Sequence, residues 1–380
     1  MPNILTNLIP DLYEGLDVVS RELVGFVPSV ARNSNAERAA VGESVIVPIS
    51  VPTAAGNTTP AMSVPEPSDF STDTTAIVIT KSRNVSFGLT GEEYRGLQNG
   101  VGANSVLQGN IQQAIRTLCN EIEEDVAVEA ANGSGAVYGT AGTTPFASNL
   151  GDAAEIRKVL DDAGAPAGER SLVINTAAGV NLRKLTQLTN VNQAGTAMTL
   201  RQGELLDLFG LSVKESAGIK EIAKGTATGL TVKTATKGAT ELEAKAVTSG
   251  SLNVGDVITL AGDSTKYIVT AIPQSLAANA KFSIRPALAA NAADGTAVTV
   301  AGNSSRNVAF TRSAIQLVTR APALPAGNDS AVDSMMLTDP RSGLSFEVRV
   351  YAGYRKMRME VACAWGVKTI KPEHVATMLG

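Results

Sequence analysis

The sequence has little of what most catalytic and metal sites are built from. It contains one histidine, His374, and two cysteines, Cys119 and Cys363, among 380 residues. A single histidine provides no histidine-rich metal cluster, and a Ser-His-Asp arrangement would lack any Gly-x-Ser-x-Gly elbow. The chain has no Gly-Lys dipeptide and therefore no phosphate-binding P-loop. We expect no catalytic residue, no cofactor and no metal, and a protein that is not an enzyme.

Aromatic residues, positive charge and long apolar runs are also scarce. Aromatics make up 4% of the chain, which leaves few platforms on which bases or sugars could stack. The 32 Lys and Arg residues against 36 Asp and Glu residues give a net charge of −4. Because Lys and Arg supply the sequence-independent affinity for phosphates, we expect no tight grip on DNA. No segment approaches the ~20 apolar residues that span a membrane, and no signal peptide is expected.

Several conspicuous residues are expected to have structural roles. The two cysteines are expected to be buried thiols, and His374 a surface or cap residue. The stretch GSGAVYG (133–139) has the wrong spacing for a dinucleotide loop and is expected to be a flexible loop. Neighbouring positions on a helix diverge by about 100°, so adjacent carboxylates do not converge on a substrate and are expected on solvated faces. These pairs are Glu123/Glu124 and Asp161/Asp162.

The first part of the chain is predicted to be an arm. Pro10 suits the first turn of a helix, and carboxylates near a helix start interact favourably with its dipole. These carboxylates are either a capped, solvated helix end or a docking face for a basic partner. They are Asp11, Glu14 and Asp17.

A protruding hairpin follows the arm. Residues 43–51 and 74–89 are β runs, and the segment between them is rich in Pro, Ser, Thr and Gly. Such a segment cannot form a helix, so it is predicted to be a long irregular tip. From Val51 through Thr80 the sequence contains no Lys or Arg.

The clearest helix is predicted over 104–131. Its apolar residues recur at helical spacing and form one stripe, and its length gives a rod on the order of 40 Å. The stripe consists of Leu107, Ile111, Ile115, Leu118, Ile122 and Val126. After it, helices are predicted over 152–163, 177–188 and 200–209, and strands over 171–175 and 211–216.

A separate β module is predicted in the second half of the chain. From about 222 the composition shifts to Thr, Ala, Gly and Val, and near 306 it shifts back. Short strands at hairpin spacing favour a small inserted barrel, which we expect to fold on its own. The strands are predicted near 229–234, 242–247, 256–261, 266–272, 281–286 and 296–301. The chain then continues with strands over 345–352 and 355–370 and a short helical tail after Pro372.

The order of these parts, together with three stretches of sequence, resembles a known family. The stretches are SLNVGDVITLAG (251–262), RNVAFTRSAIQLVTRAPALP (306–325) and TDPRSGLSFEVRVYAGYRKMRMEVACAWGVKTIKPEHV (338–375). They resemble the major coat proteins of tailed bacteriophages, which have the Hong-Kong-97-type capsid fold. The similarity is to the short-tailed-phage coat family that carries an inserted β-barrel domain.

The resemblance implies an α+β capsid fold with the following parts. They are an N-terminal arm (1–42), an extended hairpin loop (43–90), a P-domain with a spine helix (91–150), an A-domain (151–221), an inserted β-barrel domain (222–305), a return segment of the A/P-domain (306–330) and a C-terminal P-domain sheet (331–380).

The resemblance also implies a function. Copies would form hexamers and pentamers of an icosahedral virion shell around double-stranded DNA, assembled in the host bacterial cytoplasm with a scaffolding protein and a portal. No membrane is involved. Some relatives join a loop Lys to an Asn of a neighbour, and the absence of Lys from Val51 to Thr80 predicts no such crosslink here. The alternatives are an encapsulin-like bacterial compartment and a β-rich surface or adhesin module.

Overall fold

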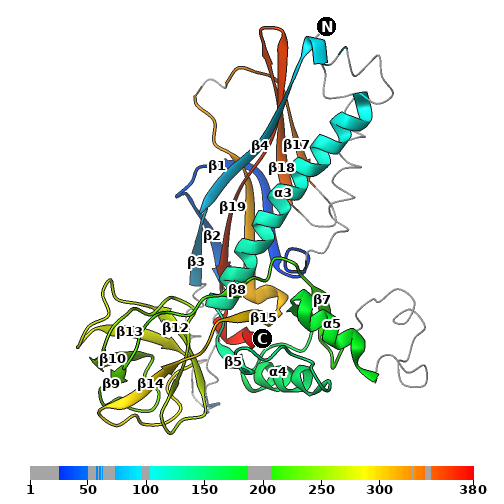
Figure 1. Ribbon diagram of the computed structural model, residues 1–380. Coiled ribbons are helices and arrows are strands. Elements are labelled where there is room, and N and C mark those ends of the chain that lie inside the picture. The colour runs from blue at the N-terminus through cyan, green and yellow to red at the C-terminus, as the bar shows by residue number, and fades with distance from the viewer. Residues whose placement is uncertain are drawn as a thin grey trace.

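A computed structural model describes residues 25–49, 57–58, 60, 62, 73–93, 95, 103–186, 207–326, 329–338 and 344–380. The described part is α+β, with two six-stranded sheets, a closed six-stranded barrel and a two-stranded hairpin. Figure 1 shows an elongated body formed by the first sheet and its long helix, with the second sheet and the barrel side by side at one end. None of the described helices is long and apolar enough to cross a membrane.

The first sheet is covered by the long helix α3 (Ala103–Asn132), which lies along strands β4 and β19 (Figure 1). The predicted apolar stripe is confirmed from Ile111 to Val126, because each of its members in that span is buried. They pack against fully buried residues of the sheet, including Trp365 and Phe346. The strands run in the order β1 (Ala31–Ala39), β16 (Ile315–Pro322), β19 (Lys356–Thr369), β18 (Ser345–Gly353) and β17 (Ala331–Thr338), with β4 (Lys81–Thr90) also paired to β19.

The β run predicted over 74–89 is two strands. Strand β3 (Asp73–Val78) pairs with β2 (Ser44–Ile49), whereas β4 pairs with β19. The change of partner occurs at two residues, since Ile79 N donates to Glu43 O and Thr80 N donates to Trp365 O. An uninterrupted β-type sequence does not reveal a change of partner, because alternation of side chains is the same in both sheets.

The second sheet packs against two short helices, α4 (Gly151–Asp162) and α5 (Thr176–Lys184). It has the order β5 (Ala136–Tyr138), β20 (Val375–Leu379), β15 (Ser304–Thr311), β6 (Arg170–Ile174) and β7 (Ser212–Glu215), with β8 (Glu221–Ile222) also paired to β15.

Three predictions for this region are wrong. The tail after Pro372 is helical only over the short η3 (Pro372–His374) and then becomes β20, a strand of the second sheet rather than of the C-terminal P-domain sheet. All five residues of β20 are buried, and a short buried strand has no alternation that distinguishes it from a helix. The helix predicted to reach residue 209 is absent over 207–209, where Leu208 and Leu211 form an isolated bridge.

The third wrong prediction concerns 133–139, which was expected to be a flexible loop. Residues 136–138 form strand β5, paired in parallel with β20. Gly135 lies so close to the backbone that a Cβ there would be 2.4 Å from Pro372 O. The glycines in this segment therefore permit close packing of backbone against backbone.

The six strands predicted in the β module are all present and close into a barrel. Most of its buried apolar residues, from Leu230 to Val298, form a hydrophobic cluster of their own. The strands are β9 (Thr231–Val232), β10 (Glu241–Ala246), β11 (Val257–Leu260), β12 (Lys266–Ala271), β13 (Lys281–Arg285) and β14 (Thr296–Val300).

Because the barrel has its own core and a closed sheet without free edges, residues 222–305 are expected to fold alone. The isolated fragment should give a β-type circular dichroism spectrum and a cooperative thermal transition. A random-coil spectrum without a transition would show that the barrel depends on the rest of the chain.

Candidate assembly surfaces

The hairpin β2–β3 has one face that the subunit buries. Val47, Ile77 and Ile79 are buried and pack against residues of β1, β16 and β19. Lys368 Nζ of β19 also donates to Thr75 Oγ1, at 2.9 Å. The hairpin is therefore held firmly along its inner face.

The outer face of the same hairpin is apolar and exposed. Ile46 and Val78 have exposed fractions of 68% and 46%. Ile46 pairs with Ala76 and Ser44 with Val78, so the Ile46 and Val78 side chains are diagonal neighbours on this face. Adjoining exposed apolar side chains make this face a candidate for contact with another protein. We call Ile46, Ala76 and Val78 the outer strip.

The base of the hairpin is tied to the long helix through Lys81. Its Nζ lies 2.8 Å from Asp125 Oδ1 and 3.2 Å from Glu121 Oε1. Trp365 Nε1 donates to the other oxygen of Asp125 at 2.8 Å. Burial lowers the pKa of Lys81, but the hydrogen bonds and charges of Asp125 and Glu121 outweigh this and raise it overall. Lys81 is thus held protonated at the base of β4 and is unsuited to act as a nucleophile.

Residues 25–27 of the arm are anchored by a buried carboxylate, Glu123. Its oxygens accept hydrogen bonds from the backbone N–H groups of Gly25, Phe26 and Val27 at 2.7–2.9 Å. Ser216 Oγ donates a fourth hydrogen bond at 2.6 Å. Successive N–H groups turned toward one anion form a backbone nest, and here they satisfy a charge that water cannot reach.

The packing around this nest is close. A Cβ on Gly25 would lie 2.6 Å from Val173 Cγ1, so only glycine fits there without displacing the second sheet. The ring of Phe26 stacks on that of Phe310, with centroids 5.9 Å apart. The end of the arm is consequently part of the main hydrophobic core.

The expectation that Glu123 is solvated is wrong. It is 2% exposed, whereas Glu124 points outward and pairs with Lys220 at 2.7 Å. The angle between neighbouring helix positions explains both outcomes, because it forces one member of the pair toward the core. The position of Glu123 beside Ile122, at the flank of the apolar stripe, is the sequence signal that could have identified it.

The other residues singled out by sequence have structural surroundings. Asp161 pairs with Arg170 at 2.6 Å, and Asp162 is exposed. His374 is partly buried, and its burial lowers its pKa. Both cysteines are buried, and burial raises the pKa of Cys363 to about 12.

The described part of the chain contains no group of three His, Cys, Asp or Glu residues that could hold a metal ion. The predicted docking residues Asp11, Glu14 and Asp17 lie outside the described residues.

A second cluster, of charged residues far apart in the sequence, holds β1 in place within the first sheet. No pattern in the sequence predicts it. Arg38 Nη1 donates to Glu347 Oε2 at 2.9 Å, across 309 positions in the sequence. Arg349, on the same strand as Glu347, pairs with Asp329 at 2.8 Å, and Tyr351 donates to that carboxylate as well. Burial raises the pKa of Tyr351 to about 12, assisted by its hydrogen bond to Asp329.

Comparison with known proteins finds similarity only at the level of solved structures: no family model and no curated protein matches the chain. The capsid of the cyanophage P-SCSP1u is similar over 92% of this chain and 86% of its own, at 12% identity and a TM-score of 0.49. The mature capsid of bacteriophage PhiM1 is similar over 93% and 86%, at 13% identity and a TM-score of 0.44. A virus-like particle from Pyrococcus furiosus is similar over 97% and 98%, at 10% identity and a TM-score of 0.45.

Replacing Glu123 tests the anchor directly. Glu123→Gln keeps the shape but removes the charge and turns an NH₂ group toward N–H donors, so it should lower the free energy of unfolding by about 3 kcal/mol. Urea unfolding of the isolated subunit measures this. Glu124→Gln, one position away, partly exposed and paired only with the exposed Lys220, is the matched control and should change stability by less than about 0.5 kcal/mol. Equal effects of the two substitutions would show that the nest does not hold the arm.

Proposed function

We propose that this chain is a major capsid protein that assembles into hexamers and pentamers of an icosahedral shell enclosing double-stranded DNA. The exposed outer strip is the main observation behind the proposal. It is an apolar surface on a hairpin whose other face is already packed, and the described part of the subunit leaves it exposed, so we assign its burial to another molecule. A shell supplies that molecule as the next copy of the same chain.

The architecture supports this assignment part by part. Hairpin β2–β3 would be the extended loop, α3 and the first sheet the P-domain, and the second sheet with α4 and α5 the A-domain. The barrel of β9 to β14 would be the inserted domain. In this reading the arm and the loop reach neighbouring subunits, while Glu123 and Lys81 fix their bases to the spine helix.

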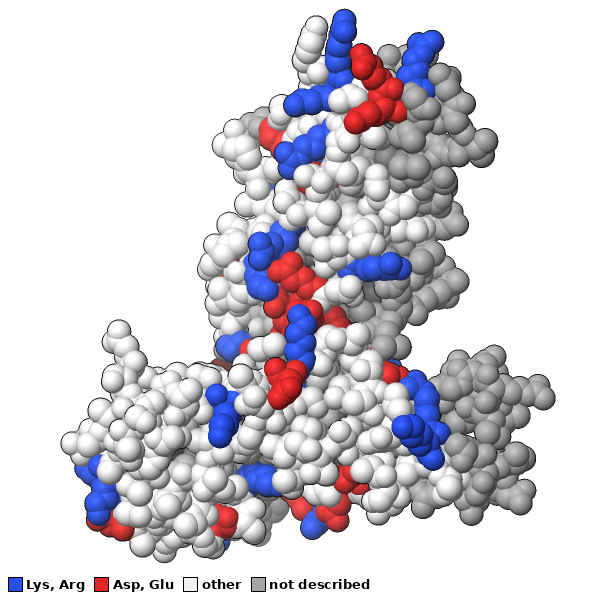
Figure 2. All heavy atoms as spheres, viewed as in Figure 1, with Lys and Arg blue, Asp and Glu red and all other residues white. Residues whose placement is uncertain are grey.

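The charge distribution supports enclosure of DNA without tight binding. In the face shown in Figure 2, Lys and Arg side chains lie beside Asp and Glu, and the described residues of this face form no broad field of one sign. Ion pairs such as Lys81–Asp125 and Lys220–Glu124 also bring charges of opposite sign together. Because phosphate binding depends on uncompensated basic charge, DNA packed in such a shell would be held loosely.

The hairpin face provides the decisive experiment. Ile46→Asp places a charge in the outer strip and should slow shell formation on the order of tenfold or more without destabilising the subunit. Negative-stain microscopy of the purified chain, alone and with its genomic neighbours, follows the assembly. Val332→Asp, at a 50% exposed apolar position on edge strand β17, is the control and should still assemble.

The outcomes of that experiment separate the alternatives. Closed shells from the unaltered chain, lost in Ile46→Asp and kept in Val332→Asp, support the proposal. Shells that enclose protein instead of DNA would favour an encapsulin-like compartment. Small monodisperse monomers under all conditions would contradict shell formation and favour a surface or binding module.

We also propose that a scaffolding protein docks on the arm through Asp11, Glu14 and Asp17, and that a portal occupies one vertex. Charge pairing of this kind mainly raises the rate of encounter. Replacing all three carboxylates by Asn should therefore slow scaffold-dependent assembly, and the wild-type rate should fall as salt increases. Assembly kinetics that stay unchanged in the triple variant would leave these residues as a helix cap only.

The shell is expected to mature without covalent crosslinks. No Lys occurs from Val51 to Thr80, and Lys81 is engaged by Asp125 and Glu121 at the base of the hairpin. Particles boiled in detergent and reductant should run as one band near 39.2 kDa. A ladder of multimers with Lys–Asn linked peptides in the mass spectrum would contradict this prediction.

A further inference from the structure

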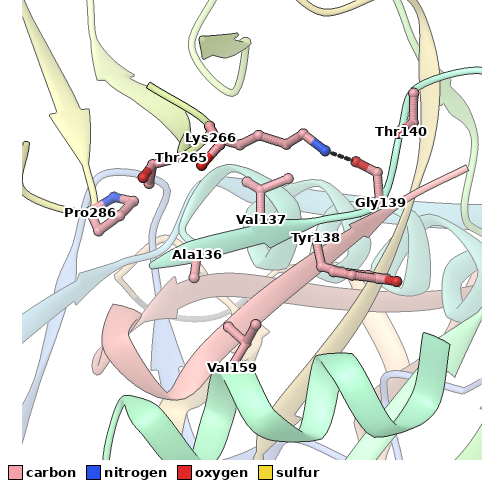
Figure 3. A pocket seen from close by; sticks show the side chains of 10 residues that line it. Ala136, Val137, Tyr138, Gly139, Thr140, Val159, Thr265, Lys266 and Pro286 are labelled. Carbon is pink, nitrogen blue, oxygen red and sulfur yellow. Dashed lines mark hydrogen bonds between the residues drawn. The ribbon is translucent and has the colours of Figure 1, made fainter. Parts of the chain in front are cut away.

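The seam between the barrel and the rest of the subunit contains cationic side chains that bond to backbone carbonyls instead of carboxylates. Lys266, at the start of β12, extends over Val137 and donates to Gly139 O just beyond β5 (Figure 3). In the opposite direction, Arg306 of β15 donates to Gly255 O in the barrel, at 2.7 Å. Two hydrogen bonds therefore cross the seam, one donated by the barrel and one accepted by it.

A third cation connects the barrel to the end of the long helix. Arg285, the last residue of β13, donates to Gly133 O, directly after α3, at 3.4 Å. Burial lowers the pKa of Arg285, of Arg306 and of Lys266, and it is the leading cause in each. None of the three forms an ion pair with a carboxylate of the described residues. The Arg306 bond is buried, and the Lys266 and Arg285 bonds are partly buried. A bond from a cation to a carbonyl is hard to replace where water is excluded.

Steric fit and apolar contact reinforce the seam. Gly255 has φ +90°, and a Cβ there would lie 2.0 Å from Asn132 Oδ1, the last residue of α3. The positive φ disfavours any other residue at the point where the barrel approaches the helix. Val257 and Ile268 of the barrel form a buried cluster with Leu379 of β20.

The covalent connections alone would not fix the barrel. The chain enters and leaves it through β8 and the start of β15, which pair at only two positions, Ile222 with Ser304 and Glu221 with Ser305. Such a short two-stranded stalk can bend and twist. The orientation of the barrel must therefore come from the seam.

We infer that the seam locks the barrel to the second sheet and to the adjoining end of α3 as one rigid unit, with Arg306 and Lys266 as the lock. A tilt of the helix end would then carry the barrel with it, instead of being absorbed in the stalk. This inference concerns the single subunit and holds or fails whether or not shells form.

Distances between two spin labels test the lock in the full-length chain. Lys237→Cys places one label on the barrel and Lys158→Cys the other on α4, both at exposed positions. Cys119 and Cys363 are buried and should not take up label. Double electron–electron resonance on the labelled protein with the seam intact should give one narrow distribution of distances between the two labels. In the double variant Arg306→Gln/Lys266→Met, the distance distribution should become broad. The control Lys233→Met breaks an ion pair within the barrel, away from the seam, and should leave the distribution narrow.

Hydrogen exchange distinguishes undocking from unfolding. In the double variant, amides of β5 should exchange on the order of tenfold faster, while amides of the barrel strand β13 keep their protection. A broad distribution in the unaltered protein, or a narrow one in the double variant, would overturn the lock. Loss of protection throughout the barrel would overturn it as well, because the seam residues would then hold the barrel's own fold.

Discussion

The subunit depends on satisfying one buried negative charge. The Glu123 carboxylate lies in the core, where an unpaired charge would be strongly destabilising. Its four donors come from residues 25–27 and from Ser216, which are far from it in sequence. Forming the nest therefore brings the end of the arm, the long helix and the edge of the second sheet to one place. Phe26 then completes the core by stacking on Phe310.

The closely packed core contrasts with the exposed outer strip of the hairpin. Lys81, Asp125 and Trp365 fix the base of the hairpin to the helix and the first sheet, and the inner face of the hairpin is buried. The outer strip has no such partner within the described part of the chain. A rigid support beneath an apolar strip lowers the conformational cost of association, since little has to be ordered when a neighbour binds.

The sequence predicts the elements whose patterns are long or repeated. Helix α3 follows from an apolar stripe over several turns, and the six barrel strands follow from β runs separated by turn residues. The hairpin follows from two β runs around a segment that cannot be helical. These are local signals, and each is repeated often enough to be read from one sequence.

What the sequence does not predict depends on contacts between distant residues. The change of partner at Ile79 and Thr80 and the strand character of β20 are decided by neighbours elsewhere in the chain. The burial of Glu123 is decided by N–H groups 96 to 98 positions away. Side-chain identity indicates that a carboxylate is present, but only the fold shows whether water or a backbone nest surrounds it.

The central claim is that the outer strip is an interface between subunits, and a reconstruction of assembled particles tests it most directly. The account predicts that the side chains covering Ile46 and Val78 belong to a neighbouring copy of this chain. Particles in which both side chains face solvent, or are covered by residues of their own subunit, would contradict it.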